Sequence, residues 1–112
     1  SVLVEYYQKL FDCDYESPYM LYVVKCKDNE SYPAIVHVDN TCRIQTVNQE
    51  PQNESYYSLI ESFRKKTGIP MILNTSLNID GKPIAGDPAD AHKLFEISDL
   101  DAVVVGNEIK VK

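Results

Sequence analysis

The sequence predicts an α/β (α+β) fold in which helices pack on a mixed β-sheet. Runs of apolar and β-branched residues of strand length recur along the 112 residues. Two further stretches place apolar residues at helical spacing, and they alternate with these runs. The order, strands, helix, strand, helix, strand, predicts a single domain over residues 1–112. A chain of this length can bury roughly two thirds of its unfolded surface, which is enough for a core.

In the first half of the chain, one short helix should precede three strands. Residues 4–11 are expected to be helical, because Tyr7, Leu10 and Phe11 fall on one helical face. Three β-rich runs of strand length follow, at 19–26, 34–38 and 42–47. The polar turn between the last two runs is short enough for an antiparallel hairpin.

The middle of the chain predicts an amphipathic helix that ends near Lys66. Its apolar residues recur at i, i+3, i+4 and i+7, and they are Tyr56, Leu59, Ile60 and Phe63. Asn53 or Ser55 is placed to cap the start of this helix, and Gly68 is placed to end it. The basic residues 64–66 favour the helix dipole, so we interpret them as a helix end and not as a binding patch.

A buried strand and a polar loop come next. Residues 69–73 are apolar on both faces, as a central strand requires. The chemistry then changes to a small polar loop at 74–83. A second helix is expected to begin with Asp87 as its cap and Pro88 in its first position. His92 is expected on the polar, exposed side of this helix. Two more strands complete the chain, at 102–105 and 109–111, and Gly106-Asn107 is expected to form the turn between them.

Charge and cysteine content restrict the possible partners and compartments. The formal net charge of -6 argues against a nucleic-acid backbone as the main partner. Cys13, Cys26 and Cys42 lack metal-ligand spacing, and we interpret them as reduced thiols of a cytoplasmic protein. No apolar run approaches the ~20 residues of a membrane span. Because Ser1 is not Met and residues 2–4 open as though the chain were already inside a fold, we expect an excised fragment.

The polar loop after the central strand is the candidate ligand site. Its polar side chains are Asn74, Thr75, Ser76 and Asn78. A small polar loop at the carboxyl end of an inner strand is where open α/β sheets bind ligands. Hydroxyl, amide and backbone N–H groups suit an anion or a carbonyl group. The alternative is that these residues only cap local turns.

The spacing within this loop predicts which side chains share a cleft. Ser76 and Asn78 are two residues apart, so an extended backbone sends both to one side and Leu77 to the other. Leu77 is then expected to anchor the loop in the core. Arg43, on a neighbouring strand, is expected to point into the same cleft and bring a positive charge there.

Arg43 and His37 each have two interpretations. The guanidinium of Arg43 could hold phosphate or carboxylate oxygens in a bidentate contact, or it could pair with Asp39 or Glu50. His37 lies among apolar residues of a predicted strand, where a histidine is more often structural than catalytic. No Cys–His or Ser–His spacing supports a nucleophile, so no catalytic residue is assigned. The carboxylates show no metal site.

Several stretches of the chain match a known family in order and spacing. They are Ser17-Pro18-Tyr19-Met20, His37-Val38-Asp39, Arg43-Ile44-Gln45-Thr46-Val47, Leu73-Asn74-Thr75-Ser76-Leu77-Asn78 and Pro83-Ile84. Together they resemble the carboxyl-terminal region of the O-carbamoyltransferase family, which includes nodulation protein U and enzymes of antibiotic tailoring. The polar loop also resembles the Ser-Thr-Ser-Ala-Asn signature of YrdC-like domains. The resemblance implies a YrdC-like fold, present here as an incomplete fragment.

The resemblance also implies a reaction and its substrates. Such enzymes use ATP and carbamoyl phosphate to form carbamoyl adenylate, and they transfer the carbamoyl group to a hydroxyl of an acceptor. A metal ion would lie only in an amino-terminal domain of the same polypeptide. That domain is absent here, as are the family's Lys-x-Arg pair and Gly-Pro-Arg-Ala-Leu-Gly stretch. The resemblance assigns substrate binding to Arg43, Asn74, Thr75, Ser76, Asn78 and His37.

The chain departs from the family pattern at three loop positions. Leu77 stands where Phe is usual, Asp80 where Arg is common, and Lys82 where Glu is common. The last two look like an exchange of charges across the turn. Ser76 and Asn78 keep the family residues.

Two classes of function therefore stay open. The first is the carboxyl-terminal part of a carbamoyltransferase that binds small-molecule substrates, with no nucleic-acid or membrane partner. The second is a non-catalytic binding or interaction module with the same fold. In either case we expect the isolated fragment to be inactive. We also expect it to expose an apolar patch or a bare sheet edge, through which it could self-associate.

Overall fold

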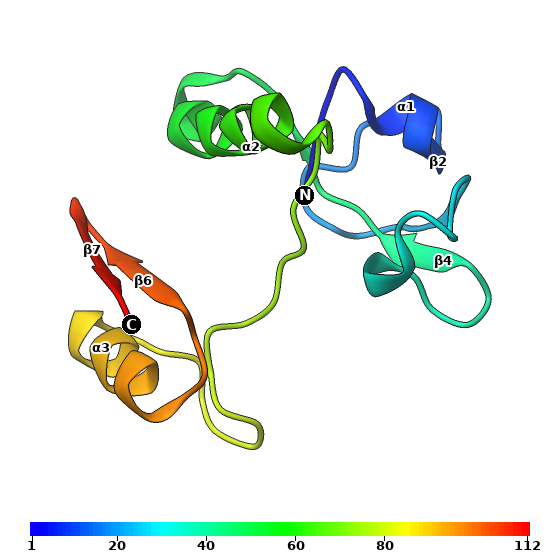
Figure 1. Cartoon of the computed structure of the whole chain (residues 1–112). Coiled ribbons are helices and arrows are strands. Elements are labelled where there is room, and N and C mark those ends of the chain that lie inside the picture. The colour runs from blue at the N-terminus through cyan, green and yellow to red at the C-terminus, as the bar shows by residue number, and fades with distance from the viewer. The chain divides into compact units, whose positions relative to one another are not determined.

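The computed structural model describes residues 1–112 and divides into two compact units, unit 1 (Ser1–Asn74) and unit 2 (Thr75–Lys112) (Figure 1). The elements in chain order are β1 (Val2–Leu3), α1 (Tyr7–Leu10), β2 (Phe11–Asp12), β3 (Val23–Cys26), η1 (Pro33–Ile35), β4 (Thr41–Arg43), β5 (Thr46–Val47), η2 (Pro51–Asn53), α2 (Glu54–Thr67), α3 (Pro88–Ile97), β6 (Ala102–Val105) and β7 (Glu108–Val111). They confirm the α+β class, with the strands distributed over three small sheets and no closed barrel. That all residues form a single domain stays a prediction.

The first residues of the chain lie in the middle of unit 1. β1 pairs in parallel with β5, with Val2 opposite Thr46. On its other side, β1 meets the segment 70–72 in an antiparallel arrangement, through a bridge between Val2 and Met71. Segments about 45 and 70 residues apart in sequence therefore lie side by side, and Val2 and Leu3 between them are 1% and 0% exposed.

The second sheet of unit 1 is antiparallel in the order β2–β3–β4. Along β3, exposed and buried residues alternate, as expected for a sheet with one face on the core. Its inward residues Val24 and Cys26 pack with Phe11 of β2 and Cys42 of β4. The three cysteines of the chain are free, as the sequence predicted.

The helix α2 confirms the amphipathic pattern at Ile60, in its middle, but not along the whole stripe. Ile60 is fully buried between β1 and β5, whereas Leu59 and Phe63 are 58% and 39% exposed. Gly68 ends the helix with a left-handed φ of 80°, which glycine adopts without a steric cost. The predicted cap is wrong, because Asn53 makes no capping hydrogen bond and its side chain donates to Asn48 instead.

Three other predictions for unit 1 are wrong in extent or type. The helix expected at 4–11 is reduced to α1, because β1 and β2 pair the residues on either side of it. The run 34–38 forms no strand, since Pro33 opens the short helix η1 there. The run 42–47 divides between β4, which pairs with β3, and β5, which pairs with β1, so no hairpin with 34–38 exists.

The segment 69–73 is also not the central strand that the sequence predicts. Pro70 and Met71 are buried, but Leu73 is 64% exposed. Pairing occurs on one side only, with residues 1–3. Its apolar residues on both faces led to the prediction of a central strand. In the structure the segment lies at the edge of the paired residues, with a partner on one side only.

Unit 2 consists of α3 and the hairpin β6–β7. Asp87 caps α3 as predicted, since its Oδ1 accepts from the Asp90 N–H at 2.9 Å. Gly106, with a φ of 60°, forms the predicted turn between the two strands. The core of this unit is a cluster of Ala91, Phe95 and Val103. None of the helices in the chain has both the length and the hydrophobicity that a membrane crossing needs.

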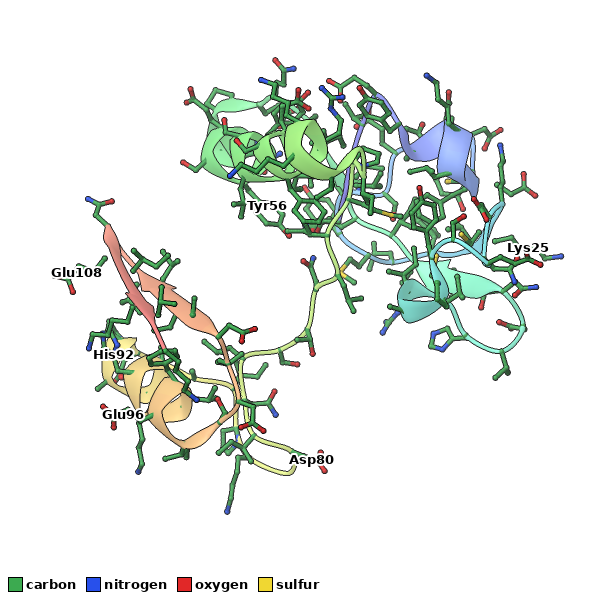
Figure 2. The ribbon with its side chains drawn as sticks, in the orientation of Figure 1. Lys25, Tyr56, Asp80, His92, Glu96 and Glu108 are labelled. Atoms are coloured by element: carbon green, nitrogen blue, oxygen red, sulfur yellow. The ribbon has the colours of Figure 1, made fainter.

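The outer face of α3 departs from prediction at one residue. His92 was expected on the surface, but it is half-buried and its Nδ1 has no hydrogen-bond partner. His92 and Glu96 both project from this helix (Figure 2).

Candidate functional site

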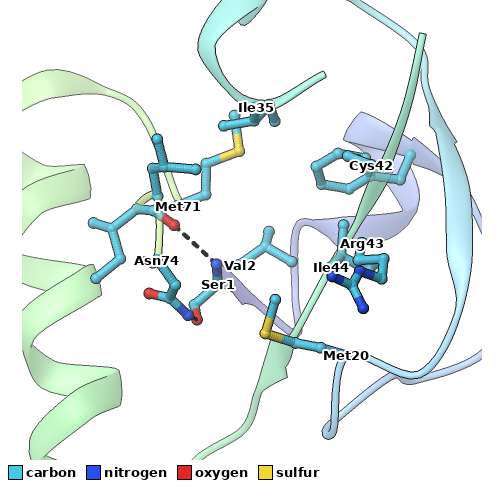
Figure 3. A pocket seen from close by; sticks show the side chains of 12 residues that line it. Ser1, Val2, Met20, Ile35, Cys42, Arg43, Ile44, Met71 and Asn74 are labelled. Carbon is cyan, nitrogen blue, oxygen red and sulfur yellow. Dashed lines mark hydrogen bonds between the residues drawn. The ribbon is translucent and has the colours of Figure 1, made fainter. Parts of the chain in front are cut away.

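Unit 1 contains a small cavity between the end of β4 and the segment 71–74 (Figure 3). Its volume is about 60 Å³. Most of the lining side chains are apolar, and they include Val2, Phe11, Met20, Ile44 and Met71. This space accepts a few water molecules or a group of a few atoms, and it is far below the ~300 Å³ of the smallest ordinary ligand pockets.

Arg43 supplies the only charged side chain of this cavity. It ends β4, directly opposite Val23 of β3, on the exposed face of that sheet. The ion pairs of the chain join Glu61 to Arg64 and to Lys65, so Arg43 has no carboxylate partner. The alternative in which Arg43 pairs with Asp39 or Glu50 is therefore not observed.

Asp39 is instead occupied within its own turn. Its Oδ1 accepts from the N–H and the hydroxyl of Thr41, at 3.1 and 2.6 Å. These hydrogen bonds, the one from the hydroxyl first, lower the pKa of the Asp39 carboxyl. The Arg43 guanidinium thus remains available to an external anion.

Cys42 adds a neutral group to the same cavity. Burial, and then the nearby Cys26 thiol, raise its pKa to about 11. The thiol therefore stays protonated at neutral pH, and Arg43 is the one charged side chain of a cavity that the amino group of Ser1 also lines. An environment of this kind favours a small anion over a cation.

Asn74 lines the opposite side of the cavity within a polar cluster. Its Oδ1 accepts from the Tyr56 hydroxyl of α2 at 2.7 Å, and its Nδ2 donates to Gln45 Oε1 at 3.3 Å and to Ser1 Oγ. Ser1 Oγ in turn donates to Gln45 Oε1 at 2.8 Å. Figure 2 shows Tyr56 projecting from α2, and Figure 3 shows Asn74 next to Ser1. These bonds fix the orientation of the Asn74 amide.

The strand that carries Arg43 and Gln45 is held by the segment around Ser17. The Ser17 hydroxyl donates to the Ile44 carbonyl, and the backbone N–H of Ser17 donates to the Thr46 hydroxyl. Met20, three residues later, lines the cavity with a φ of 56°. A bulky residue rarely adopts this conformation, which is enriched at functional sites.

The polar loop opens unit 2, and its residues differ in their contacts. Thr75 and Ser76 are exposed. The Asn78 amide donates to the carbonyls of Ile79 and Lys82, both at 3.1 Å, and so braces the turn that contains Gly81. The local-capping alternative therefore holds for Asn78.

Leu77 does not anchor this loop in the core as predicted, because it is 36% exposed. Its carbonyl accepts from the Ala85 N–H at 2.9 Å, so the loop is held by its backbone.

His37 is not on a strand, contrary to prediction. It lies in an exposed turn after η1, where its N–H donates to the Thr41 carbonyl and its carbonyl accepts from Asn40. It does not line the cavity that Arg43 and Asn74 share. The predicted strand 34–38 had placed it among apolar residues, and the absence of that strand removes this environment.

The structure brings two of the six predicted site residues, Arg43 and Asn74, to one cavity. A cleft shared with Ser76 and Asn78 stays a prediction, as do the substrate-binding roles of all six residues. Sequence reasoning missed the parts played by Gln45, Tyr56 and Met20. Gln45 and Met20 belong to the stretches that carry the family resemblance, which could have pointed to them. Tyr56 appears in the sequence only as part of the apolar pattern of a helix, which does not predict a role for its hydroxyl.

The arrangement in unit 1 can hold a small anionic or carbonyl-containing group. Arg43 offers two parallel N–H donors to a pair of oxygens, and Asn74 offers an oriented amide. No group of three or more His, Cys, Asp or Glu side chains is arranged to hold a metal ion.

Comparisons with known proteins match the chain to one family over its full length. The family model described as "Carbamoyltransferase C-terminus" matches residues 1–112. Nodulation protein NolNO of Sinorhizobium fredii is 41% identical over 112 residues, which cover 96% of this chain and 16% of the relative. Nodulation protein NolO of Bradyrhizobium diazoefficiens is 41% identical over 91 residues, which cover 80% of this chain and 16% of the relative.

A relative with a named enzymatic activity also matches. The 3'-hydroxymethylcephem-O-carbamoyltransferase of Amycolatopsis lactamdurans is 33% identical over 104 residues, which cover 93% of this chain and 20% of the relative. The chain thus spans a fifth or less of the length of these three relatives.

Proposed function

The chain belongs to the carbamoyltransferase C-terminus family, and we propose that it supplies part of the substrate-binding surface of a carbamoyltransferase. In this proposal the enzyme forms carbamoyl adenylate from carbamoyl phosphate and ATP and then transfers the carbamoyl group to a hydroxyl acceptor. An amino-terminal domain of the same polypeptide contributes the acceptor site and any metal ion.

One observation carries the proposal for this chain. Arg43 is unpaired and is the only charged side chain of a cavity that also contains the oriented amide of Asn74. Arg43 is exposed at the end of β4 and no carboxylate neutralises it, so its charge is available to a ligand. A free guanidinium beside an amide suits the oxygens of a phosphate or a carbamate.

The chemistry requires positioning and charge neutralisation more than a covalent nucleophile. Water first hydrolyses carbamoyl phosphate to carbamate and phosphate, and a carbamate oxygen then attacks the α-phosphorus of ATP while pyrophosphate leaves. Arg43 would neutralise oxygens of the carbamate or the phosphate during this step. Ser76 would orient the carbamoyl group through its hydroxyl. The cavity holds only a few atoms, so the nucleotide must bind mainly to other parts of the enzyme.

Substitution of Arg43 tests this proposal. In the longer polypeptide, Arg43→Ala should weaken substrate binding by ~1.5–3 kcal/mol, or roughly 10- to 150-fold, because a charge-assisted contact is lost. ATP–pyrophosphate exchange in the presence of carbamoyl phosphate measures the effect. Arg43→Lys should recover only part of the loss, since an ammonium cannot make the bidentate contact. Unchanged exchange by Arg43→Ala would reject the assigned role.

Ser76→Ala is the cleaner test of the polar loop. The Ser76 side chain is exposed and makes no hydrogen bond, so its removal should lower the exchange rate while the melting temperature stays unchanged. Asn78→Ala cannot separate function from folding, because its amide braces the turn.

The isolated 112-residue chain should show no exchange above background. It spans a fifth or less of the relatives named above, and its cavity is too small for the nucleotide. Exchange by the purified chain would contradict the division of the site between two domains.

The second candidate function is a non-catalytic binding module. The small cavity and the local hydrogen bonds of Asn78 favour it. It predicts that the longer polypeptide binds phosphate through Arg43 yet catalyses no ATP–pyrophosphate exchange.

A further inference from the structure

The segment 69–73 has one paired edge and one bare edge. Ser1 N donates to the Ile72 carbonyl at 2.8 Å (Figure 3), and the Ile72 N–H donates back to the Ser1 carbonyl at 2.9 Å. The Leu3 N–H donates to the Pro70 carbonyl at 3.1 Å. In an antiparallel ladder, successive residues direct their backbone groups to opposite edges. Met71 and Leu73 therefore direct their N–H and C=O groups away from β1.

Those outward groups have no partner in the chain. Neither the N–H nor the C=O of Met71 or Leu73 takes part in a hydrogen bond. Met71 is nevertheless only 6% exposed. Buried backbone groups in native proteins are nearly always paired, because an unpaired one loses its hydrogen bonds to water without replacement. The bare edge thus lacks a partner that the native protein is expected to provide.

An apolar groove accompanies this edge. It has a volume of about 340 Å³ and lies between η1, the end of α2 and the segment 69–73. Tyr32, Ile35, Phe63, Ile69 and Leu73 contribute to its walls. Phe63 and Leu73 are 39% and 64% exposed, so the groove opens to solvent. A strand added to the bare edge would place alternate side chains on each face of the sheet, and an apolar set of them would fill such a groove.

The edge also lacks the features that keep exposed strands from pairing. No charged residue occurs in 69–73. Pro70 does not protect the outer edge, because its missing N–H faces β1. Natural proteins guard an edge that stays exposed with charges, prolines or bulges. An unguarded edge is consistent with permanent cover by the same polypeptide, since a free one would promote association between copies.

We propose that a β-strand from the remainder of the longer polypeptide pairs with Met71 and Leu73 and places apolar side chains in the adjoining groove. This proposal rests on the proposed function, in which the chain is one part of a larger carbamoyltransferase. The three relatives named above are at least five times longer than the region matched, so they have ample chain to supply the strand. The pairing would make 69–73 a central strand, which its sequence of apolar residues on both faces predicts.

Hydrogen–deuterium exchange at the two amides tests the proposal. In the 112-residue chain, the Met71 and Leu73 amides should exchange rapidly, whereas the Ile72 amide, bonded to Ser1, should be protected. In the longer polypeptide, all three should be protected, with Met71 and Leu73 exchanging at least about 100-fold more slowly than in the short chain. Rapid exchange of Met71 and Leu73 in the longer polypeptide would overturn the proposal.

Two other outcomes identify a different occupant and would also overturn it. Protection of Met71 and Leu73 in the monomeric 112-residue chain would mean that the chain covers its own edge. Protection that rises with protein concentration, together with a dimer in sedimentation, would identify a second copy as the partner.

A substitution pair separates backbone pairing from side-chain packing. Leu73→Pro removes the outward N–H and should leave the melting temperature of the 112-residue chain unchanged, because that N–H is unbonded there. In the longer polypeptide it should abolish the protection of Met71, while Leu73→Val, which keeps the N–H, should preserve it. ATP–pyrophosphate exchange is measured separately, so a protected edge without activity would reject the proposed function alone. An active enzyme with a bare edge would reject this inference alone.

Discussion

The two units of the chain differ in how much apolar surface they bury. Unit 1 contains eleven of the fourteen buried apolar residues, and unit 2 contains three. The outer face of the β6–β7 hairpin meanwhile exposes Val104, Ile109 and Val111, each by about two thirds. A hairpin with one helix rarely forms a stable fold by itself, because its core is too small. Unit 1 therefore has the larger core and is expected to be the more stable of the two units.

The largest effect should come from the centre of unit 1. Leu3→Ala removes a fully buried side chain that packs on Val47 and Ile60, and it should cost ~4 kcal/mol of the free energy of unfolding. All eight tyrosines lie in unit 1, so tyrosine fluorescence during urea unfolding reports on that unit. The matched change Leu59→Ala, at a residue 58% exposed, should alter this free energy by no more than ~0.5 kcal/mol. Equal effects of the two changes would contradict the placement of β1 in the core.

A slightly smaller effect is expected from the core of unit 2. Phe95→Ala removes the largest of the three buried side chains and should cost that unit ~3 kcal/mol. The amides of β6 and β7 should then exchange at nearly the unprotected rate, while the tyrosine transition of unit 1 keeps its midpoint. A shift in both readouts would show that the two units unfold together.

The cap of α3 should contribute less. Asp87→Ala removes the acceptor for the Asp90 N–H and should lower the stability of the helix by ~1 kcal/mol. Faster amide exchange in the first turn of α3 would measure this loss. Asp99→Ala is the control, since Asp99 is exposed, follows the helix and caps nothing. If Asp99→Ala had the larger effect, the capping role of Asp87 would be rejected.

The last effect appears only at alkaline pH, and it concerns unit 1. The pKa of Cys42 is raised from its ordinary value of 9.0 to about 11 by burial, so the folded state holds the thiol proton more tightly than the unfolded state. The unfolded state therefore binds fewer protons between these two values, and unit 1 loses stability as pH rises through that window. Cys42→Val should remove this part of the pH dependence, as measured by urea unfolding at pH 8, 9 and 10. An unchanged slope would mean that other groups cause it.

Local signals in the sequence predicted the elements that depend on local interactions. The helix α3 follows from Asp87 and Pro88, and the hairpin β6–β7 follows from a β-branched run and the Gly106 turn. Elements that depend on distant partners were predicted poorly. Residues 2–3 pair with β5 on one side and with the segment 69–73 on the other. Both partners are distant in sequence, so no local pattern predicts these pairings.

The candidate site, like the fold, was predicted only in part from the sequence. Arg43 and Asn74 were chosen from residue chemistry and family resemblance, and the structure places both at one cavity. The predicted environment of His37 failed, because it depended on a strand at 34–38 that Pro33 prevents. Tyr56 was missed because its hydroxyl donates to Asn74, which lies 18 residues away in sequence. The helical spacing of apolar residues predicts only that the tyrosine ring packs on the core.

The central position of β1 has a consequence for synthesis of the protein. Ser1 and Ile72 are bonded across 71 residues, so the first strand is made long before its partners. At a translation rate of roughly 5–20 residues per second, about 4 to 14 seconds pass before residue 72 is added. β1 can pair with β5 once residues 46–47 are made, but its other edge stays unpaired until residues 70–72 follow, in reach of chaperones on the ribosome. Unit 1 should therefore complete its fold only after most of it has been translated, and slower translation should prolong its dependence on chaperones.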